Sequence, residues 1–247
     1  MHFLLISVAL QVLCIVHVFR TGRNTAWIMA IAFLPMVGIL AYFIVEILPG
    51  LRHDRRVRDA RTKFADKMDP ERRVRAAQDT VDFSNTAGNR LELGDALMAR
   101  ERYDEALAQF REAERLSPHV DRAIGMRIAE AAYEAGHLVE ALAAIDKLPE
   151  TISQTELDRR TQLRAKIAEA DGRAQDALTL YRGIVDRVPG DEIRCRMAAL
   201  LLAEGDRRGA KTLLQEVEQR MKRTPPVTLK AEAAMYDWAK RTLAELR

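Results

Sequence analysis

The stretch NRLELGDALMARERYDEALAQFREAERLSP, residues 89–118, decides the fold of this chain. Its apolar residues recur at the three- and four-residue spacing of an amphipathic helix, in two blocks separated by a short charged segment. Ser-Pro closes the second block, and proline commonly follows a helix end. The stretch therefore predicts two helices that pack against each other as a hairpin. The positions that set this pattern are Leu93, Gly94, Leu97, Tyr103, Ala106, Phe110, Ala113 and Pro118.

The same pattern recurs along the rest of the chain. Counted from Ala106, small residues follow at Ala141, Ala177 and Ala210, at intervals of 35, 36 and 33 residues. Small residues let two helix axes approach closely, and glycine accepts the positive φ that ends a helix. We therefore expect four consecutive helical hairpins. Their companion positions are Ala129, Gly136 and Ile145 in the second, Ala165, Gly172, Tyr181 and Pro189 in the third, and Ala198, Gly205 and Leu214 in the fourth.

These positions resemble the tetratricopeptide repeat, whose ideal period is about 34 residues. The resemblance implies an α-solenoid in which the first helix of each repeat lines a groove for protein segments. Each groove residue could instead only pack or solvate its own helix. The groove does not match the Lys/Asn carboxylate clamp of the chaperone-binding members. The implied groove positions are Leu91, Asp95 and Met98; Met126, Glu130 and Tyr133; Gln162, Lys166 and Glu169; and Cys195, Ala199 and Leu202.

The repeats are expected to occupy residues 87–247 and to be covered at both ends. A helix after Pro70, within a basic linker over residues 51–86, is expected to cover the first repeat. An amphipathic segment over about residues 228–246 is expected to cap the last one. Trp238 in this segment fits packing better than ligand contact. The end of the second repeat is open, because its proline comes early, at Pro149.

Residues 1–50 differ from the rest of the chain in being strongly apolar. Two apolar runs, at about residues 3–19 and 26–48, predict a two-helix transmembrane hairpin. A cleaved signal peptide is the alternative for the first run, but no basic segment precedes it. Arginines after the second run would place both termini and the repeats in the cytoplasm. The whole prediction is an all-α, multi-pass protein of the bacterial inner membrane.

The second apolar run carries Trp27, Pro35, Gly38 and Tyr42. In this order they resemble the two-span N-terminal module of cardiolipin synthases and related phospholipase D-type membrane enzymes. The resemblance implies an anchor without the enzyme, because no histidine here begins the H-x-K-x4-D motif of that family. Pro35 is expected to kink the second helix, and Gly38 to admit the first one closely.

A basic cluster follows the apolar runs. It includes Arg52, Arg55, Arg56 and Arg58. These side chains could bind anionic lipid headgroups, or they could only set the orientation of the hairpin. Nucleic-acid binding is not expected, because no aromatic residues alternate with the arginines.

Composition excludes several classes of function. Lys and Arg number 39 against 36 Asp and Glu, which gives no excess suited to nucleic acid. The two cysteines, Cys14 and Cys195, lie in segments of opposite character, so no disulfide framework is expected. The sequence has no zinc-ligand spacing, phosphate loop or nucleophile elbow. It therefore predicts no cofactor, no metal and no enzymatic activity.

Two functional hypotheses follow from these patterns. The first is a membrane-anchored cytoplasmic scaffold that binds protein partners of unknown identity through the groove. The alternative is a non-catalytic accessory or regulator of phospholipid metabolism, which rests on the N-terminal resemblance alone.

Overall fold

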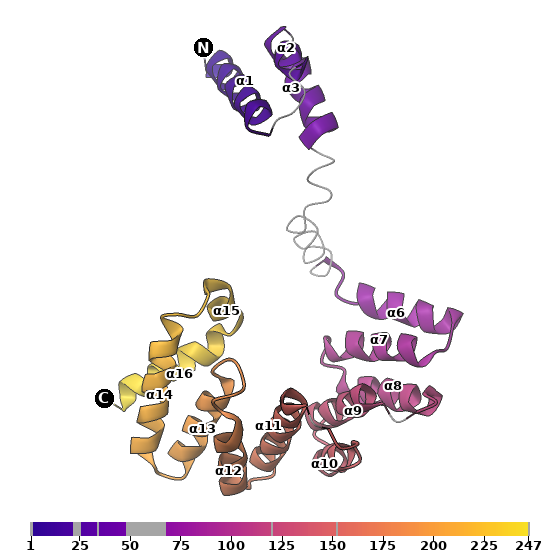
Figure 1. Ribbon diagram of the computed structural model, residues 1–247, viewed down its shortest axis with the longest axis vertical. Helices are drawn as coiled ribbons and strands as arrows, with labels where there is room; N and C mark the ends of the chain where they lie inside the picture. The colour runs from indigo at the N-terminus through magenta and orange to yellow at the C-terminus, as the bar shows by residue number, and fades with distance from the viewer. Residues whose placement is uncertain are drawn as a thin grey trace. The chain divides into compact units, whose positions relative to one another are not determined.

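The structure is a computed structural model that describes residues 2–21, 26–33, 35–47, 68–119, 121–151 and 153–246. Every regular element in these ranges is helical (Figure 1). The chain divides into two units, Met1–Arg72 and Arg73–Arg247.

Over residues 2–47, the described part of the N-terminal unit contains four helical elements. Pro35 follows a break in the second apolar run, and its ring leaves no N–H to bond the carbonyl four residues back. The Gln11 side chain donates to that carbonyl, on Ile31, at 2.9 Å. A polar side chain of the first run therefore supplies the hydrogen bond that the Ile31 carbonyl lacks at the break in the second run. The elements are α1 (His2–Thr21), α2 (Ala26–Phe33), α3 (Pro35–Tyr42) and a π-helical turn (Phe43–Ile47).

Three of the four N-terminal motif residues lie around one small core. The Tyr42 hydroxyl lies 2.8 Å from His17 Nδ1, and the Tyr42 ring meets Trp27 edge-on at 5.4 Å between centroids. A Cβ on Gly38 would lie 2.3 Å from the Ala30 carbonyl oxygen, so this glycine brings α3 close to α2. The atoms nearest to that Cβ belong to α2, and the expected close approach to the first helix stays a prediction.

The predicted transmembrane hairpin is wrong. Among the residues described, no helix combines the length and apolar character needed to cross a bilayer. The second run gives two helices of 8 residues each, whereas a span needs about 20. The prediction of a multi-pass inner-membrane protein fails on the same finding.

Some of the sequence predictions fall on residues outside the described ranges. Arg52, Arg55, Arg56 and Arg58 belong to residues 48–67, so the proposed lipid contacts of this cluster lie there. The side chain of Pro35 is likewise outside the described residues, although its backbone begins α3.

The second unit is a succession of antiparallel helix pairs (Figure 1). Each pair joins a first helix and a second helix of one repeat, after a leading helix and before a C-terminal pair. The leading helix is α6 (Arg72–Phe83) and the repeats are α7 (Ala87–Met98) with α8 (Tyr103–Leu116), α9 (Arg122–Glu134) with α10 (Leu138–Asp146), α11 (Gln154–Ala170) with α12 (Ala174–Ile184), and α13 (Glu192–Ala203) with α14 (Arg207–Met221); α15 (Pro226–Ala231) and α16 (Ala233–Glu245) follow.

Small residues lie where the two helices of a repeat cross. Gly94 on α7 is the tightest of these positions, because a Cβ there would lie 2.3 Å from the Phe110 ring. The equivalent first-helix residues Ala129, Ala165 and Ala198 have no exposed surface, and neither do the second-helix residues Ala106, Ala141, Ala177 and Ala210. These residues let large side chains fill the space beside the crossing. The large side chains are Phe110, Ile145, Tyr181 and Leu214, each at most 1% exposed.

The turn inside each repeat requires a left-handed residue. Glycine supplies it in three repeats, with φ of 82° at Gly136, 77° at Gly172 and 85° at Gly205. The first repeat places Glu101 at the same point, with φ of 59°. A residue with a Cβ is strained in this conformation. The first repeat therefore keeps a local strain that its neighbours avoid.

Replacing Glu101 by glycine is expected to stabilise the repeats. Relief of the left-handed strain outweighs the greater chain entropy of glycine, so the free energy of unfolding should rise by about 0.5 to 1 kcal/mol. Urea denaturation followed by circular dichroism measures the change. The matched control is Gly136→Ala, which meets no atom within 4 Å and should lose about 1 kcal/mol through backbone strain alone. A loss of stability in Glu101→Gly would contradict this account.

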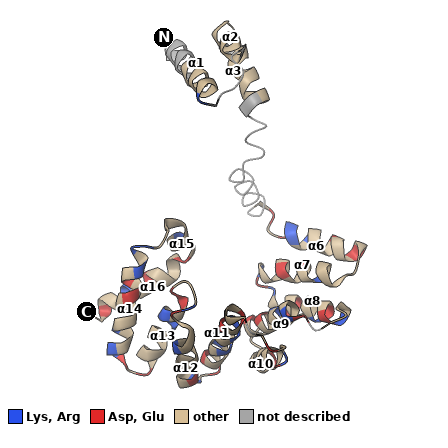
Figure 2. Ribbon diagram, viewed as in Figure 1, with Lys and Arg blue, Asp and Glu red and all other residues tan. Residues whose placement is uncertain are grey.

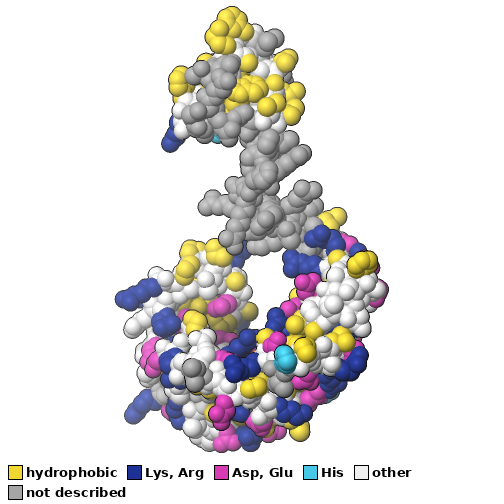
Figure 3. Space-filling model, turned by 45° about the vertical axis from the view of Figure 1, so that its right-hand side comes forward, with side chains coloured by type: hydrophobic (Ala, Val, Ile, Leu, Met, Phe, Trp, Pro, Cys, Tyr) yellow, Lys and Arg dark blue, Asp and Glu magenta, His cyan; other side chains and the backbone are white. Residues whose placement is uncertain are grey.

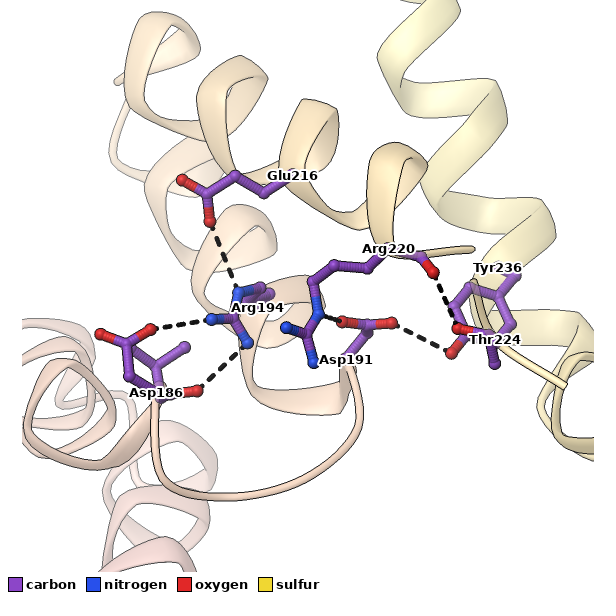
Figure 4. A network of polar contacts seen from close by, with 8 residues as sticks. Asp186, Asp191, Arg194, Glu216, Arg220, Thr224 and Tyr236 are labelled. Carbon is purple, nitrogen blue, oxygen red and sulfur yellow. Dashed lines mark hydrogen bonds and ion pairs between the residues drawn. The ribbon is translucent and has the colours of Figure 1, made fainter. Parts of the chain in front are cut away.

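Further helices cover the two ends of the repeats. At the N-terminal end, the Asn89 side chain donates to the Ser84 carbonyl at 2.7 Å and fixes the end of α6 against α7. At the C-terminal end, the Tyr236 hydroxyl on α16 donates to Asp191 at 3.1 Å (Figure 4). Asp191 is 2% exposed, immediately before α13, and it also accepts from Arg220 of α14 at 2.5 Å. One buried carboxylate thus joins the fourth repeat to the terminal helix.

Candidate protein-binding groove

A cavity of about 260 Å³ lies between the first helices of the first three repeats. We call it the groove pocket. It combines apolar surface from Met98 and Leu163 with the half-buried ring of Tyr133. The predicted groove residues Met98, Glu130, Tyr133, Gln162 and Lys166 all line it, together with Glu134, Arg159 and Leu163.

Ion pairs connect successive first helices beside this pocket. Asp95 of α7 accepts two hydrogen bonds from Arg127 of α9, at 2.8 and 3.1 Å. Glu130 of α9 accepts two from Arg159 of α11, both at 2.8 Å. Paired hydrogen bonds of this kind fix the relative orientation of the two side chains. The spacing of the first helices is therefore held by specific side-chain contacts.

Between α11 and α13 the signs of the pair are reversed. Lys166 takes the position of Asp95 and Glu130 in the repeat, and it lies 2.7 Å from Glu192 of α13. A second link runs from Arg196 of α13 to both oxygens of Glu169 on α11, at 3.3 Å. The exchange of a carboxylate for an ammonium is thus matched by a carboxylate on the next helix.

The surroundings of Glu192 in this network favour its charged form. Burial opposes ionisation of Glu192, but hydrogen bonds from Lys166 and Arg196 still lower its pKa. Burial also raises the pKa of Tyr181 strongly, so its hydroxyl stays protonated and donates to Glu169 at 2.8 Å. Burial similarly raises the pKa of Tyr133. At neutral pH this part of the groove therefore holds the Glu192 carboxylate beside two neutral phenols.

The remaining predicted groove residues are placed differently. Met126 and Cys195 are 3% and 5% exposed and belong to the hydrophobic cores, so they offer almost no surface to a partner. Burial raises the pKa of the Cys195 thiol to about 12, which keeps it protonated. Leu91 and Leu202 are half-buried and Ala199 is exposed. None of these five residues lines the groove pocket.

Sequence reasoning missed the pairing residues of the groove. Arg127, Arg159, Glu192 and Arg196 were not singled out, although they neutralise the charges that were. A signal existed: each pair joins opposite charges 26 to 32 positions apart, slightly less than one repeat. A search for opposite charges at this spacing would have found them.

Lys, Arg, Asp and Glu are distributed along the helices of the repeat unit (Figure 2), and both signs of charge are mixed on the face drawn in Figure 3. On the N-terminal unit, hydrophobic side chains predominate in the space-filling view (Figure 3). Within the ranges given above, no group of three or more His, Cys, Asp or Glu side chains is arranged to hold a metal ion.

Comparison with known proteins supports the repeat assignment. Residues 97–167 match a family model described as tetratricopeptide repeat. Among solved structures, MamA of Desulfovibrio magneticus RS-1, from residue 41 to its end, is similar with a TM-score of 0.54 and 15% identity, over 68% of this chain and 94% of that one. The ArsTM double mutant of MamA RS-1 gives a TM-score of 0.53 and 15% identity, over 67% and 92%. The repeat region therefore has a tetratricopeptide-type solenoid fold.

No curated protein matches the chain in sequence. The resemblance of the N-terminal residues to cardiolipin synthases gains no support from the family match or from the similar structures.

Proposed function

We propose that the repeat unit is a non-enzymatic scaffold that binds a protein segment along its first helices, with the groove pocket at the centre of the contact. The observation that carries this proposal is the convergence of Met98, Tyr133 and Gln162 from three repeats on one cavity. The tetratricopeptide match and the solenoid fold support binding of protein partners in general.

The ion pairs support this function by holding the groove in shape before a partner arrives. A binding surface that is already ordered loses less conformational entropy on association. Because the pairs join α7 to α9, α9 to α11 and α11 to α13, all four first helices are included. We therefore expect the groove to bind as a nearly rigid surface.

Tyr133→Ala is expected to weaken partner binding at least tenfold, because aromatic side chains at the centre of an interface often contribute about 2 kcal/mol or more. The measurement is quantitative capture of partners from native cells by the full chain, followed by titration of each captured protein. The matched control is Val139→Ala on α10, where the side chain is 86% exposed and outside the pocket.

A thermal melt of both variants separates lost binding from lost folding. Equal affinity of Tyr133→Ala and Val139→Ala for every captured partner would contradict the proposed groove. Loss of binding in Tyr133→Ala alone, with its fold intact, is the expected result.

A further inference from the structure

The charges that line the groove pocket are almost all neutralised within the protein. Arg159 is bonded to Glu130, and Lys166 to Glu192. Glu134 also lines the pocket, and within the described part of the chain it has neither a hydrogen bond nor an ion pair. Its exposed carboxylate is therefore an uncompensated negative charge at the rim of an otherwise balanced cavity.

Glu101 and Tyr103 lie near Glu134, outside the lining of the pocket. Tyr103, the first residue of α8, has a raised pKa, through burial and then through the nearby carboxylates of Glu101 and Glu134. A negatively charged group entering here would meet the Glu134 carboxylate. A positively charged side chain would find in Glu134 a carboxylate free to pair with it.

The floor and walls of the pocket suit a single apolar side chain. Met98 and Tyr133 are half-buried, and Leu163 is 6% exposed, so together they offer apolar surface inside the cavity. Its volume of about 260 Å³ is below the roughly 300 to 1,000 Å³ of clefts that hold drug-sized ligands. The cavity therefore fits one anchoring side chain of a longer segment better than a bound small molecule.

Two neutral polar groups beside the apolar surface suit a peptide backbone. Gln162 carries an amide, and Tyr133 carries a hydroxyl that burial keeps protonated. Across the residues that the structure describes, neither side chain forms a hydrogen bond. An amide group both donates and accepts, as a peptide bond does, so an extended backbone could satisfy both residues.

We infer that the groove pocket takes an internal, extended segment of a protein partner in which an apolar side chain enters between Met98, Tyr133 and Leu163 and a basic side chain pairs with Glu134. This inference rests on the proposed function and names the chemistry of its partner. In an extended segment alternate side chains share a face, so the two residues stand two positions apart. A terminal carboxylate is disfavoured, because the cations of the pocket already hold carboxylates of the protein.

Four synthetic peptides test this chemistry against the full chain by fluorescence anisotropy. All have a Gly/Ser background; three are blocked at both ends and carry Leu-Ser-Arg, Leu-Ser-Glu or Ser-Ser-Arg, and the fourth ends in Leu with a free carboxylate. The Leu-Ser-Arg peptide is expected to bind best. Loss of Leu should cost about tenfold in affinity, and exchange of Arg for Glu about threefold or more.

Glu134→Gln is expected to abolish the discrimination between Arg and Glu while preserving the need for Leu. The matched control, Glu114→Gln on α8, removes an exposed carboxylate outside the pocket and should leave all four affinities unchanged. Equal binding of the Arg and Glu peptides to the unmodified protein, or preference for the free carboxylate, would overturn the inference. No binding of the Leu-Ser-Arg peptide would overturn it as well.

These outcomes differ from failure of the proposed function. If Tyr133→Ala still loses the native partner while the peptides show no preference for Arg, only the inferred chemistry is wrong. If Tyr133→Ala keeps the native partner, the groove itself is not the binding surface.

Discussion

Phe110→Ala is expected to lower the free energy of unfolding of the repeat unit by about 3 to 5 kcal/mol. Phe110 is 1% exposed and lies against Gly94, where no side chain can replace the lost ring contacts. Truncation therefore leaves a cavity at the crossing of α7 and α8, in addition to the lost burial of the ring. Urea denaturation followed by circular dichroism measures the effect.

The chain offers a matched control for this substitution. Phe83, at the end of α6, is 93% exposed, so Phe83→Ala should change stability by less than about 0.5 kcal/mol. Similar losses in the two variants would show that the Phe110 ring is not packed as the structure has it.

A solenoid can also unfold in parts, because each repeat contacts mainly its neighbours. Hydrogen exchange should then locate the Phe110→Ala loss in the first two repeats.

Asp191→Ala is expected to destabilise the C-terminal end of the solenoid by about 2 to 3 kcal/mol. The carboxylate is buried and joins Arg220 to the Tyr236 hydroxyl (Figure 4). Burial, with the nearby Asp191, raises the pKa of Tyr236 to about 12, so its hydroxyl is protonated and needs an acceptor. Removing Asp191 leaves that buried hydroxyl without this partner and separates α16 from the fourth repeat. Hydrogen exchange of α16 should rise most.

Asp158 provides the control for this network. It pairs with Arg187 across the same 29 positions that separate Asp191 from Arg220, one repeat earlier. Because the Asp158 carboxylate accepts hydrogen bonds from Arg187 and Gln154 and not from α16, Asp158→Ala should leave exchange of α16 unchanged. Faster exchange of α16 in both variants would contradict a specific link through Tyr236. Tyr236→Phe, which removes only the hydroxyl, should reproduce part of the Asp191→Ala effect.

The repeat register could be predicted from the sequence because local packing fixes it. Gly94 and its three alanine equivalents must be small wherever two helices cross, so they recur in the sequence at the repeat spacing. The glycine turns could be predicted for the same reason, because a residue with positive φ is needed at the same position of each repeat. Glu101 could not be predicted as a left-handed residue, because glutamate does not mark that conformation and only its position in the repeat identifies it.

The groove was predictable only in part. The positions on the first helices follow from the periodicity, and five of the predicted residues line the pocket. Which residue of a helix lies beside the next helix depends on the angle between the two helices, and the sequence does not state that angle. For this reason the burial of Met126 could not be foreseen, whereas Arg127 and Arg159 could have been found only through the spacing of opposite charges.

The N-terminal prediction failed for a different physical reason. Apolar composition measures how much a segment avoids water, but it does not show whether the helix is continuous. Pro35 follows the point where the second run divides, and Gln11 bonds the carbonyl that the proline leaves open. Gln11 is a polar residue inside the first apolar run, and its hydrogen bond to Ile31 makes it part of the packing of this unit.

Site-specific photo-crosslinking tests the central claim, that the groove binds a protein partner, most directly. A photoreactive amino acid would replace Tyr133 in the pocket and, in a second variant, Val139 on the outer face of α10. After irradiation in native cells, mass spectrometry would identify the adducts and the partner residues joined to each position. We predict a discrete protein adduct from position 133 that is absent from position 139. The same adducts from both positions, or a discrete adduct from position 139 alone, would contradict the groove as the binding surface.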